Sequence, residues 1–266
     1  MNVIYSFKVF KQKYYKPFDS TFFKLAKLSV DVAKQNYNTI FYCDSASEIM
    51  FRENGITFDK VIWTKEIEDY DGELPGVVKI LAMMKQTEPY IISDFDSIIF
   101  KKLIQRHTID FAYPEILNFQ KDEMWFRDYD SNYLHQFYKK PWLKYGNKFK
   151  INNKKSDELP SHISNHSLVL VSHPILISKI YQQILSVLTI AQQNECVSMF
   201  IEQFLLTYYL HHLDVDYGYI SENAPITNDI TYELFRHDFV HLINYNTDEN
   251  IDNKLNFISD IYLKKL

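Results

Sequence analysis

The chain has 266 residues, which is enough for one large α/β domain or at most two small ones. With 46% hydrophobic and 24% charged residues it has the composition of an ordinary globular protein, and its net charge of −5 argues against general electrostatic binding of nucleic acid. We expect no transmembrane segment, because the sequence has no run of about 20 apolar residues. We also expect no secretory signal, because Lys8 interrupts the short apolar N-terminus, and the two cysteines are too few for a disulfide framework, which indicates a cytoplasmic location.

The N-terminal part of the chain is predicted to alternate strands with helices. Apolar runs indicate strands at 3–9, 39–43, 60–63 and 90–93. Apolar residues at helical spacing indicate helices at 22–33, 47–54 and 75–85. Asp19 or Ser20 is suited to cap the first helix, and Gly55 to end the second. This order is typical of an α/β fold with a mostly parallel sheet and helices on both faces.

The rest of the chain is less regular. Residues 119–159 are polar, aromatic and lysine-rich, without clear periodicity. Beyond them we expect a strand at 168–171, helices at 175–189 and 198–212, and a terminal amphipathic helix with Ile251, Leu255, Ile258 and Tyr262 on its apolar side. No repeat or low-complexity linker divides the chain, so we interpret residues 1–266 as a single domain.

Polar groups follow the predicted strands at their carboxyl ends, where ligands bind in such sheets. Ser6 and Asp44 lie at the ends of the first two strands, and Asp94-Phe95-Asp96 comes directly after the strand at 90–93. Two carboxylates one residue apart repel each other, and each needs solvent or a cation. Mg²⁺ or Mn²⁺, which prefer oxygen ligands, would satisfy both, and a nucleotide diphosphate would complete the coordination shell. The alternative is that both aspartates are only turn or cap residues.

The segment around this motif resembles a known protein family. The run EPYIISDFDSIIFKKL, preceded by GVVKILAMMKQ, is similar to the metal-binding segment of GT-A-fold glycosyltransferases. The resemblance implies transfer of a sugar, of the hexosyltransferase type, from a nucleotide-sugar donor, expected to be a UDP-sugar, to a hydroxyl of a glycan or other acceptor. It implies Mn²⁺ or Mg²⁺ as cofactor, a nucleotide-sugar-binding half at 1–110 and an acceptor-binding half at 111–266.

The same resemblance implies roles for residues in the second half of the chain. Asn165, in the segment Ser-Asn-His-Ser before LVLV, would contact the donor sugar, and Glu202 would act as a base or stabilise a cationic transition state. His241, in FVHL, would be a third metal ligand beside Asp94 and Asp96. The chain departs from the family after His241, where Leu-Ile-Asn-Tyr-Asn lacks the Gly and Lys of many retaining members, so the stereochemistry stays open. His211, His212 and His237 are alternatives to His241.

Further candidates for donor binding come from the strand ends and from the helix before the motif. The full set of expected donor-binding positions is Tyr5, Ser6, Asp44, Lys79, Asp94 and Phe95. Three of them have structural alternatives, namely strand packing for Tyr5, capping of the following helix for Asp44, and an exposed helical position for Lys79. For Asn165 the alternative is a turn, and for Glu202 and His241 a solvated or structural residue.

The irregular middle segment combines aromatic and basic residues. The aromatic residues are Trp125, Phe126, Tyr129, Tyr133, Tyr138, Trp142 and Tyr145. Sugar faces pack on such rings, and the lysines between Lys139 and Lys155 suit an acidic or phosphate-bearing acceptor or contact with a membrane surface. A solvated loop is the alternative.

Two other functions are compatible with the sequence. Asp94 and Asp96 also resemble the first motif of haloacid dehalogenase-type phosphatases, in which the first aspartate is a nucleophile and the second a general acid. That family needs a later acidic pair, for which Asp214 and Asp216 are a poor substitute. The other alternative is a non-catalytic binding module with a glycosyltransferase-like fold.

Overall fold

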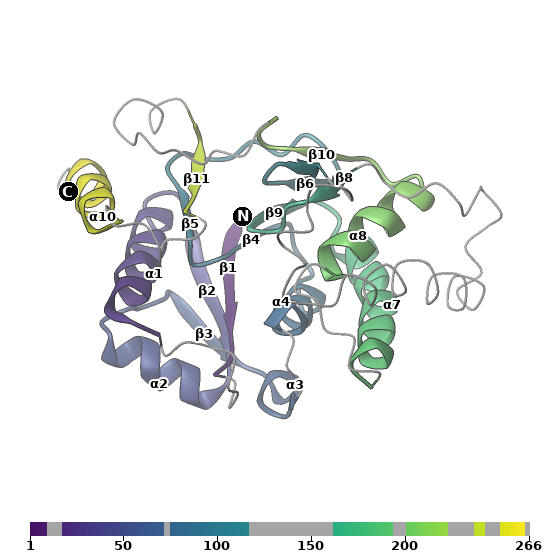
Figure 1. The fold of residues 1–266 in the computed structure, drawn as a ribbon, viewed down its shortest axis with the longest axis horizontal. Coiled ribbons are helices and arrows are strands. Elements are labelled where there is room, and N and C mark those ends of the chain that lie inside the picture. The colour runs from purple at the N-terminus through teal and green to yellow at the C-terminus, as the bar shows by residue number, and fades with distance from the viewer. Residues whose placement is uncertain are drawn as a thin grey trace.

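A computed structural model describes residues 1–9, 18–71, 75–116, 162–193, 201–222, 237–242 and 251–263 of the chain. Its centre is a seven-stranded sheet with the strand order β3-β2-β1-β4-β9-β6-β10 (Figure 1). The strands are β1 (Asn2–Phe7), β2 (Asn38–Cys43), β3 (Lys60–Trp63), β4 (Tyr90–Ser93), β6 (Ile109–Phe111), β9 (Leu168–Val171) and β10 (Tyr217–Tyr219). Neighbouring strands are parallel except around β9, which is antiparallel to both β4 and β6.

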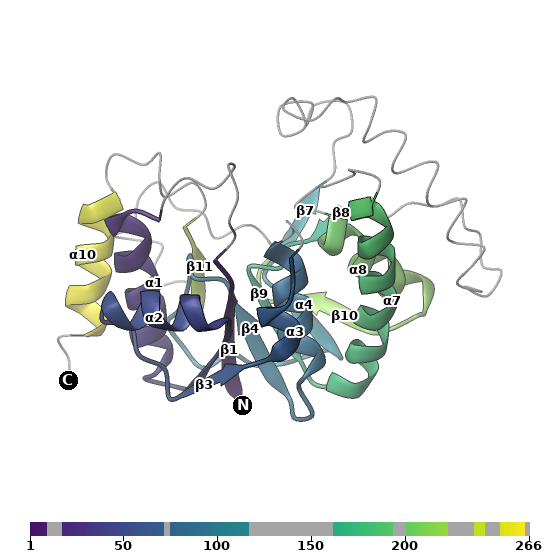
Figure 2. The same cartoon turned by 90° about the horizontal axis from the view of Figure 1, so that it is seen from below.

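Helices cover both faces of this sheet (Figures 1 and 2). One side carries α1 (Ser20–Ala33), α2 (Ser45–Glu53) and α10 (Ile251–Tyr262). The other side carries α3 (Lys65–Glu68), α4 (Pro75–Met84), α7 (Pro174–Gln193) and α8 (Ile201–His212). The predicted α/β class with a mostly parallel sheet is therefore confirmed. Among the described helices none is long and apolar enough to cross a membrane.

Two pairs of short strands lie outside the main sheet. β5 (Ser97–Ile99) pairs antiparallel with β11 (Phe239–His241), and β7 (Pro114–Ile116) pairs antiparallel with β8 (His162–Ser164). The β5–β11 pair matters for function, because it brings a segment near the C-terminus to the residues that follow β4.

Most predicted elements of the first half and the predicted strand at 168–171 are confirmed, and several element ends have local causes. The strands at 60–63, 90–93 and 168–171 agree residue for residue, whereas β1 ends at Phe7. Asp19 caps α1 by accepting a hydrogen bond from the backbone nitrogen of Phe22 at 2.9 Å. Gly55, at φ +69°, follows α2 in the left-handed conformation that glycine adopts without strain.

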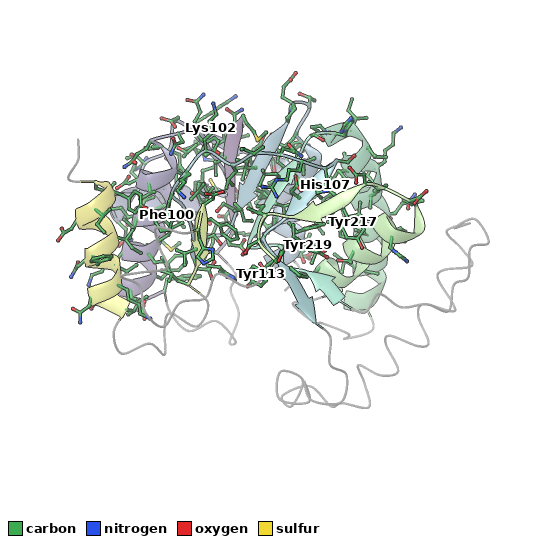
Figure 3. All side chains as sticks on the ribbon, turned by 90° about the horizontal axis from the view of Figure 1, so that it is seen from above. Phe100, Lys102, His107, Tyr113, Tyr217 and Tyr219 are labelled. Carbon is green, nitrogen blue, oxygen red and sulfur yellow. The ribbon has the colours of Figure 1, made fainter. Side chains whose placement is uncertain are left out.

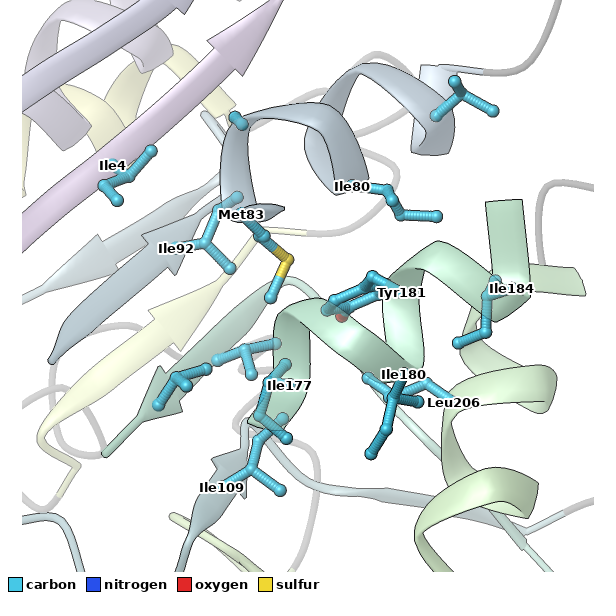
Figure 4. Close-up of a cluster of buried hydrophobic side chains, with 14 of the residues drawn as sticks. Ile4, Ile80, Met83, Ile92, Ile109, Ile177, Ile180, Tyr181, Ile184 and Leu206 are labelled. Carbon is cyan, nitrogen blue, oxygen red and sulfur yellow. The ribbon is translucent and has the colours of Figure 1, made fainter. Parts of the chain in front are cut away.

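Alternation along the strands divides the core between the two faces. Ile4 and Ile92 point to the side of α4 and α7, where they pack with Ile80, Met83 and Ile177 (Figure 4). The opposite face buries Val3 and Tyr5 against α1 and α2, among a dense group of aromatic rings. These aromatic rings are Tyr5, Phe7, Phe18, Phe22, Phe41, Phe51, Phe58 and Phe95. Much of the high aromatic content in the described part is therefore core.

The chain segment before β3 is held by an ionised carboxylate. Asp59 accepts hydrogen bonds from the backbone nitrogen of Thr39 at 2.7 Å and from its hydroxyl at 3.0 Å. The first of these bonds is the main reason why the pKa of Asp59 is lowered. A lowered folded-state pKa stabilises the fold above the ordinary carboxyl pKa, and the gain is lost as the pH falls through the folded value.

We therefore expect Asp59→Asn to be less stable than the wild type at pH 7, by about 1 kcal/mol because the site is exposed. The difference should shrink towards zero below about pH 4. Urea denaturation of both proteins at pH 7, and at the lowest pH at which both still fold, measures it. A difference that does not depend on pH contradicts the role given to the charge.

Gly218 in β10 lies against the ring of His107. Figure 3 labels His107 together with Tyr217 and Tyr219, the neighbours of Gly218 in β10. The Nδ1 atom of His107 is 2.5 Å from Oδ1 of the buried Asp110, so the ring is not free to move aside. A Cβ atom at position 218 would overlap that ring. We expect Gly218→Ala to lower the free energy of unfolding by about 1–3 kcal/mol. In a double-mutant cycle, His107→Ala should remove most of this penalty; additive losses would contradict the packing argument.

Candidate active site at the carboxyl end of β4

The Asp94-Phe95-Asp96 motif connects β4 to β5 at the edge of the sheet where the order of strands reverses. β1 and β4 are neighbours there, although six elements, from α1 to α4, separate them in sequence. Such a reversal, outside the carboxyl ends of the strands, is the usual ligand-binding position in open α/β sheets.

Main-chain hydrogen bonds fix the motif between two distant segments. The backbone nitrogen of Asp94 donates to the carbonyl of Ser167 at 2.8 Å, just before β9. The carbonyl of Asp96 accepts from the backbone nitrogen of Leu242 at 2.8 Å, just after β11. The two carboxylates are thus attached to a backbone that is held from both sides.

Lys79 of α4 binds the first carboxylate. Its Nζ atom forms an ion pair with Oδ1 of Asp94 and donates a hydrogen bond to the carbonyl of His166 at 3.0 Å. Only 15% of its side chain is exposed, so it is not the solvated helical lysine that was the alternative. Burial raises the pKa of Asp94 and the charge of Asp96 adds to this, while Lys79 acts against both.

His241 of β11 lies next to the second carboxylate. Its Nε2 atom is 3.4 Å from Oδ1 of Asp96, and its Nδ1 atom is 2.8 Å from the hydroxyl of Tyr113. The register of the β5–β11 pair, which sets His241 opposite Ser97, produces this arrangement. Burial disfavours the charge on Asp96, but His241, with smaller contributions from Lys79 and a backbone hydrogen bond, outweighs burial, and the pKa of Asp96 is lowered.

The predicted metal ligands are brought together only in part. Asp94 and Asp96 share one short loop and His241 reaches Asp96, but in the described part of the chain no group of three or more His, Cys, Asp and Glu side chains is close enough to hold a metal ion. Lys79 contributes the cation that contacts Asp94. The two carboxylates nevertheless fit a hard cation, because Mg²⁺ is commonly bound by one or two carboxylates and the phosphates of a substrate.

Three of the predicted donor-binding residues make contacts within the fold. Tyr5 is fully buried, and its hydroxyl lies 3.1 Å from the hydroxyl of Ser29, so its side chain has no surface for a ligand. Phe95, 7% exposed, stacks on Tyr5 at 5.0 Å between ring centroids. Asp44 is buried and caps α2 by accepting a hydrogen bond from the backbone nitrogen of Ser47 at 3.0 Å. The structure thus supports the structural alternatives for Tyr5 and Asp44 and places Phe95 in the core.

The remaining predicted positions differ in what can be said of them. Ser6 is half-buried near the end of β1. Asn165 is buried, and its Oδ1 accepts a hydrogen bond from the backbone nitrogen of Ser167 at 2.9 Å, which forms a turn. Glu202 lies in α8, but its side chain is outside the described residues. The aromatic and basic residues predicted for the acceptor, from Trp125 to Lys155, also lie outside the described residues.

The structure adds residues that the sequence did not single out. Tyr113 contacts His241 from the segment after β6, and the carbonyl groups of His166 and Ser167 hold Lys79 and Asp94. No local pattern marks Tyr113, whose contact spans 128 positions of the chain. His166 and Ser167 directly follow the predicted Asn165, and this position was the one indication in the sequence that they belong to the site.

The acidic pair needed by the phosphatase alternative is far from Asp94. Asp214 and Asp216 precede β10, which runs parallel to β6 and hence in the same direction as β4. They therefore lie at the amino edge of the sheet, whereas Asp94 lies at the carboxyl edge. This arrangement gives no support to a phosphatase site built from these residues.

Comparisons with known proteins find similar folds only. No protein-family profile matches the chain, and no curated protein matches its sequence. The PaToxG glycosyltransferase is 15% identical with a TM-score of 0.40, over 80% of this chain and 69% of that one. The inositol-1-phosphate CTP transferase of T. maritima is 7% identical with a TM-score of 0.46, over 97% and 96%.

The third similar structure is the glycosyltransferase GlyE of Streptococcus pneumoniae TIGR4. It is 10% identical with a TM-score of 0.40, and the match covers all of this chain but 52% of that protein. At these scores and identities the similarities assign neither a family nor an activity to this chain.

Proposed function

We propose that this protein is a metal-dependent glycosyltransferase of the hexosyltransferase type, which transfers a sugar from a nucleotide-sugar, a UDP-sugar being expected, to a hydroxyl of a glycan or other acceptor. The observation that carries the proposal is the convergence of Lys79, Asp94, Asp96 and His241 at the carboxyl end of β4. Two carboxylates, one in contact with a lysine and the other with a histidine, at a strand-order reversal suit a ligand that carries a diphosphate together with a metal ion.

The two carboxylates are the residues that would hold Mn²⁺ or Mg²⁺, with His241 as the predicted third ligand. When bound, such an ion neutralises the charge that grows on a leaving diphosphate. Lys79 brings a second positive charge to the same place, and its contacts with Asp94 and the His166 carbonyl keep it there. A nucleotide diphosphate would therefore contact two cationic groups, the metal ion and Lys79, that the protein already holds in place.

His241 and Tyr113 keep Asp96 ready for this role. The Tyr113 hydroxyl fixes the imidazole through Nδ1, so that Nε2 faces Asp96. The imidazole also favours the ionised form of Asp96, which is the form that binds a cation. Asn165 as a sugar contact and Glu202 as a base or electrostatic stabiliser complete the proposal.

A screen of donors tests this function. Purified protein is incubated with UDP-, GDP-, CMP- or dTDP-sugars, with Mn²⁺, Mg²⁺ or chelator, and release of the nucleotide is measured. We expect release from one nucleotide class that depends on the metal. Metal-dependent binding without release from any donor would favour the binding module, and hydrolysis of phosphate monoesters instead of nucleotide-sugars would favour the phosphatase.

A further inference from the structure

In His166 and Ser167, which precede β9, the main-chain carbonyl groups form hydrogen bonds, whereas the side-chain atoms Nε2 and Oγ form none within the described part of the chain. The carbonyl of His166 accepts from Lys79 and the carbonyl of Ser167 accepts from Asp94, so the backbone holds the first carboxylate and its lysine. Among the described residues, neither Nε2 of His166 nor Oγ of Ser167 has a hydrogen-bond partner. Yet both residues are buried, His166 with 1% and Ser167 with 2% exposure.

A buried polar atom without a partner is costly. Such a group typically destabilises a fold by about 1–3 kcal/mol. The His166 ring stacks on Phe111 with centroids 5.1 Å apart and planes within 10°, a contact that a phenyl ring could make without that cost. Packing alone therefore does not explain an imidazole here, whereas a hydrogen bond made only with a ligand does.

We infer that His166, assisted by Ser167, positions the donor sugar through hydrogen bonds from Nε2 and Oγ to sugar hydroxyls. The inference rests on the proposed function, because it places the transferred sugar beside the Lys79–Asp94 pair. Sugar hydroxyls are suitable partners, since each both donates and accepts. Burial and, to a smaller extent, Lys79 hold the pKa of His166 well below its usual value, so the imidazole is neutral and compatible with such a partner.

The location also separates this role from binding of the nucleotide. Within the described part of the chain, the hydrogen bonds of His166 and Ser167 to Lys79 and Asp94 come from their carbonyl groups, which side-chain substitutions leave in place. Nε2 of His166 and Oγ of Ser167 are buried in this structure. The inference therefore requires a local rearrangement, driven by binding of the sugar, that brings both atoms into contact with the donor.

The test compares binding of UDP-glucose, UDP-galactose and UDP-N-acetylglucosamine with binding of UDP, each with Mn²⁺, by isothermal titration calorimetry. The variants are His166→Phe, which keeps the ring stacked on Phe111, and Ser167→Ala. Tyr90→Phe is the matched control, because it removes another buried hydroxyl without a partner in the described part, at the far end of β4. We expect His166→Phe to weaken the best nucleotide-sugar about tenfold with UDP unchanged, and Ser167→Ala to act in the same direction.

Thermal stability supplies a second readout. His166→Phe should unfold at the wild-type temperature or above it, because an unpaired buried nitrogen is removed. An unchanged ratio of nucleotide-sugar to UDP affinity would overturn the inference while leaving the proposed function intact. An equal loss for UDP and UDP-sugars would also overturn it, since His166 would then act through Lys79 and Asp94. If the wild type binds neither UDP nor any of these sugars with Mn²⁺, the UDP-sugar function fails and the inference with it.

Discussion

Asp96→Asn should lower the rate of nucleotide-sugar turnover by about 10²–10³-fold or more, while the protein stays folded. The substitution keeps the size of the side chain but removes the charge that would bind a cation. The main-chain bond from Leu242 to the carbonyl of residue 96 is unaffected, and 27% of the Asp96 side chain is exposed. We therefore expect the melting temperature to change by no more than about 4 °C.

The matched control is Asp252→Asn, which removes a carboxylate on α10 that pairs with Lys24 at 2.8 Å and is 59% exposed. It carries the same change of net charge and should keep full activity. The rate of nucleotide release, measured for both variants with Mn²⁺ and with chelator, tests whether turnover depends on the Asp96 carboxylate and on the metal. An Asp96→Asn protein that remains active in chelator would refute the metal-dependent mechanism.

Phe95→Ala should lower the free energy of unfolding by about 3–5 kcal/mol, a large fraction of the stability of most domains. The ring is 7% exposed, stacks on Tyr5 and lies 4.8 Å from Phe51 between centroids. Its removal leaves a cavity directly beneath the two aspartates. Denaturant unfolding of Phe95→Ala and of Phe95→Leu, which keeps most of the volume, measures the effect, and the leucine variant should lose about half as much.

Phe23→Ala is the control for this second substitution. Phe23 is a half-buried residue of α1 at the edge of the same aromatic group, so the same atoms are removed with less cavity. Equal losses at positions 23 and 95 would show that Phe95 is not the central packing residue. Weaker donor binding by a fully stable Phe95→Leu variant would restore the earlier expectation that Phe95 contacts the donor.

The alternating N-terminal part could be predicted because its signals are local. These signals lie within the elements that they define or directly beside them: the cap Asp19 before α1, the apolar spacing of α1 and α4, and Gly55 after α2. The strands β5, β6 and β10 were missed, since each has three residues and exists through its pairing with a distant partner. β5, for example, pairs with β11 across more than half of the chain.

The residues of the candidate site also divide into those that local sequence indicates and those that depend on long-range packing. Asp94 and Asp96 could be named because the motif follows a buried strand, and their sequence context is contiguous. The position of Lys79 against Asp94 depends on packing of α4 over the sheet, and the contact between His241 and Tyr113 depends on the β5–β11 register. The contacts of Tyr5 in β1 and of Asp44 after β2 could not be predicted either, because tertiary packing places the Tyr5 hydroxyl against Ser29 and the Asp44 carboxylate caps α2.

The most direct test of the central claim is the stoichiometry of Mn²⁺ binding, measured by electron paramagnetic resonance in the presence of UDP. The account predicts one Mn²⁺ per chain for the wild type and for Asp252→Asn, and loss of that binding when Asp94 and Asp96 are both replaced by Asn. If the doubly substituted protein binds Mn²⁺ and UDP as the wild type does, the two aspartates are not the metal site, and the proposed mechanism is wrong.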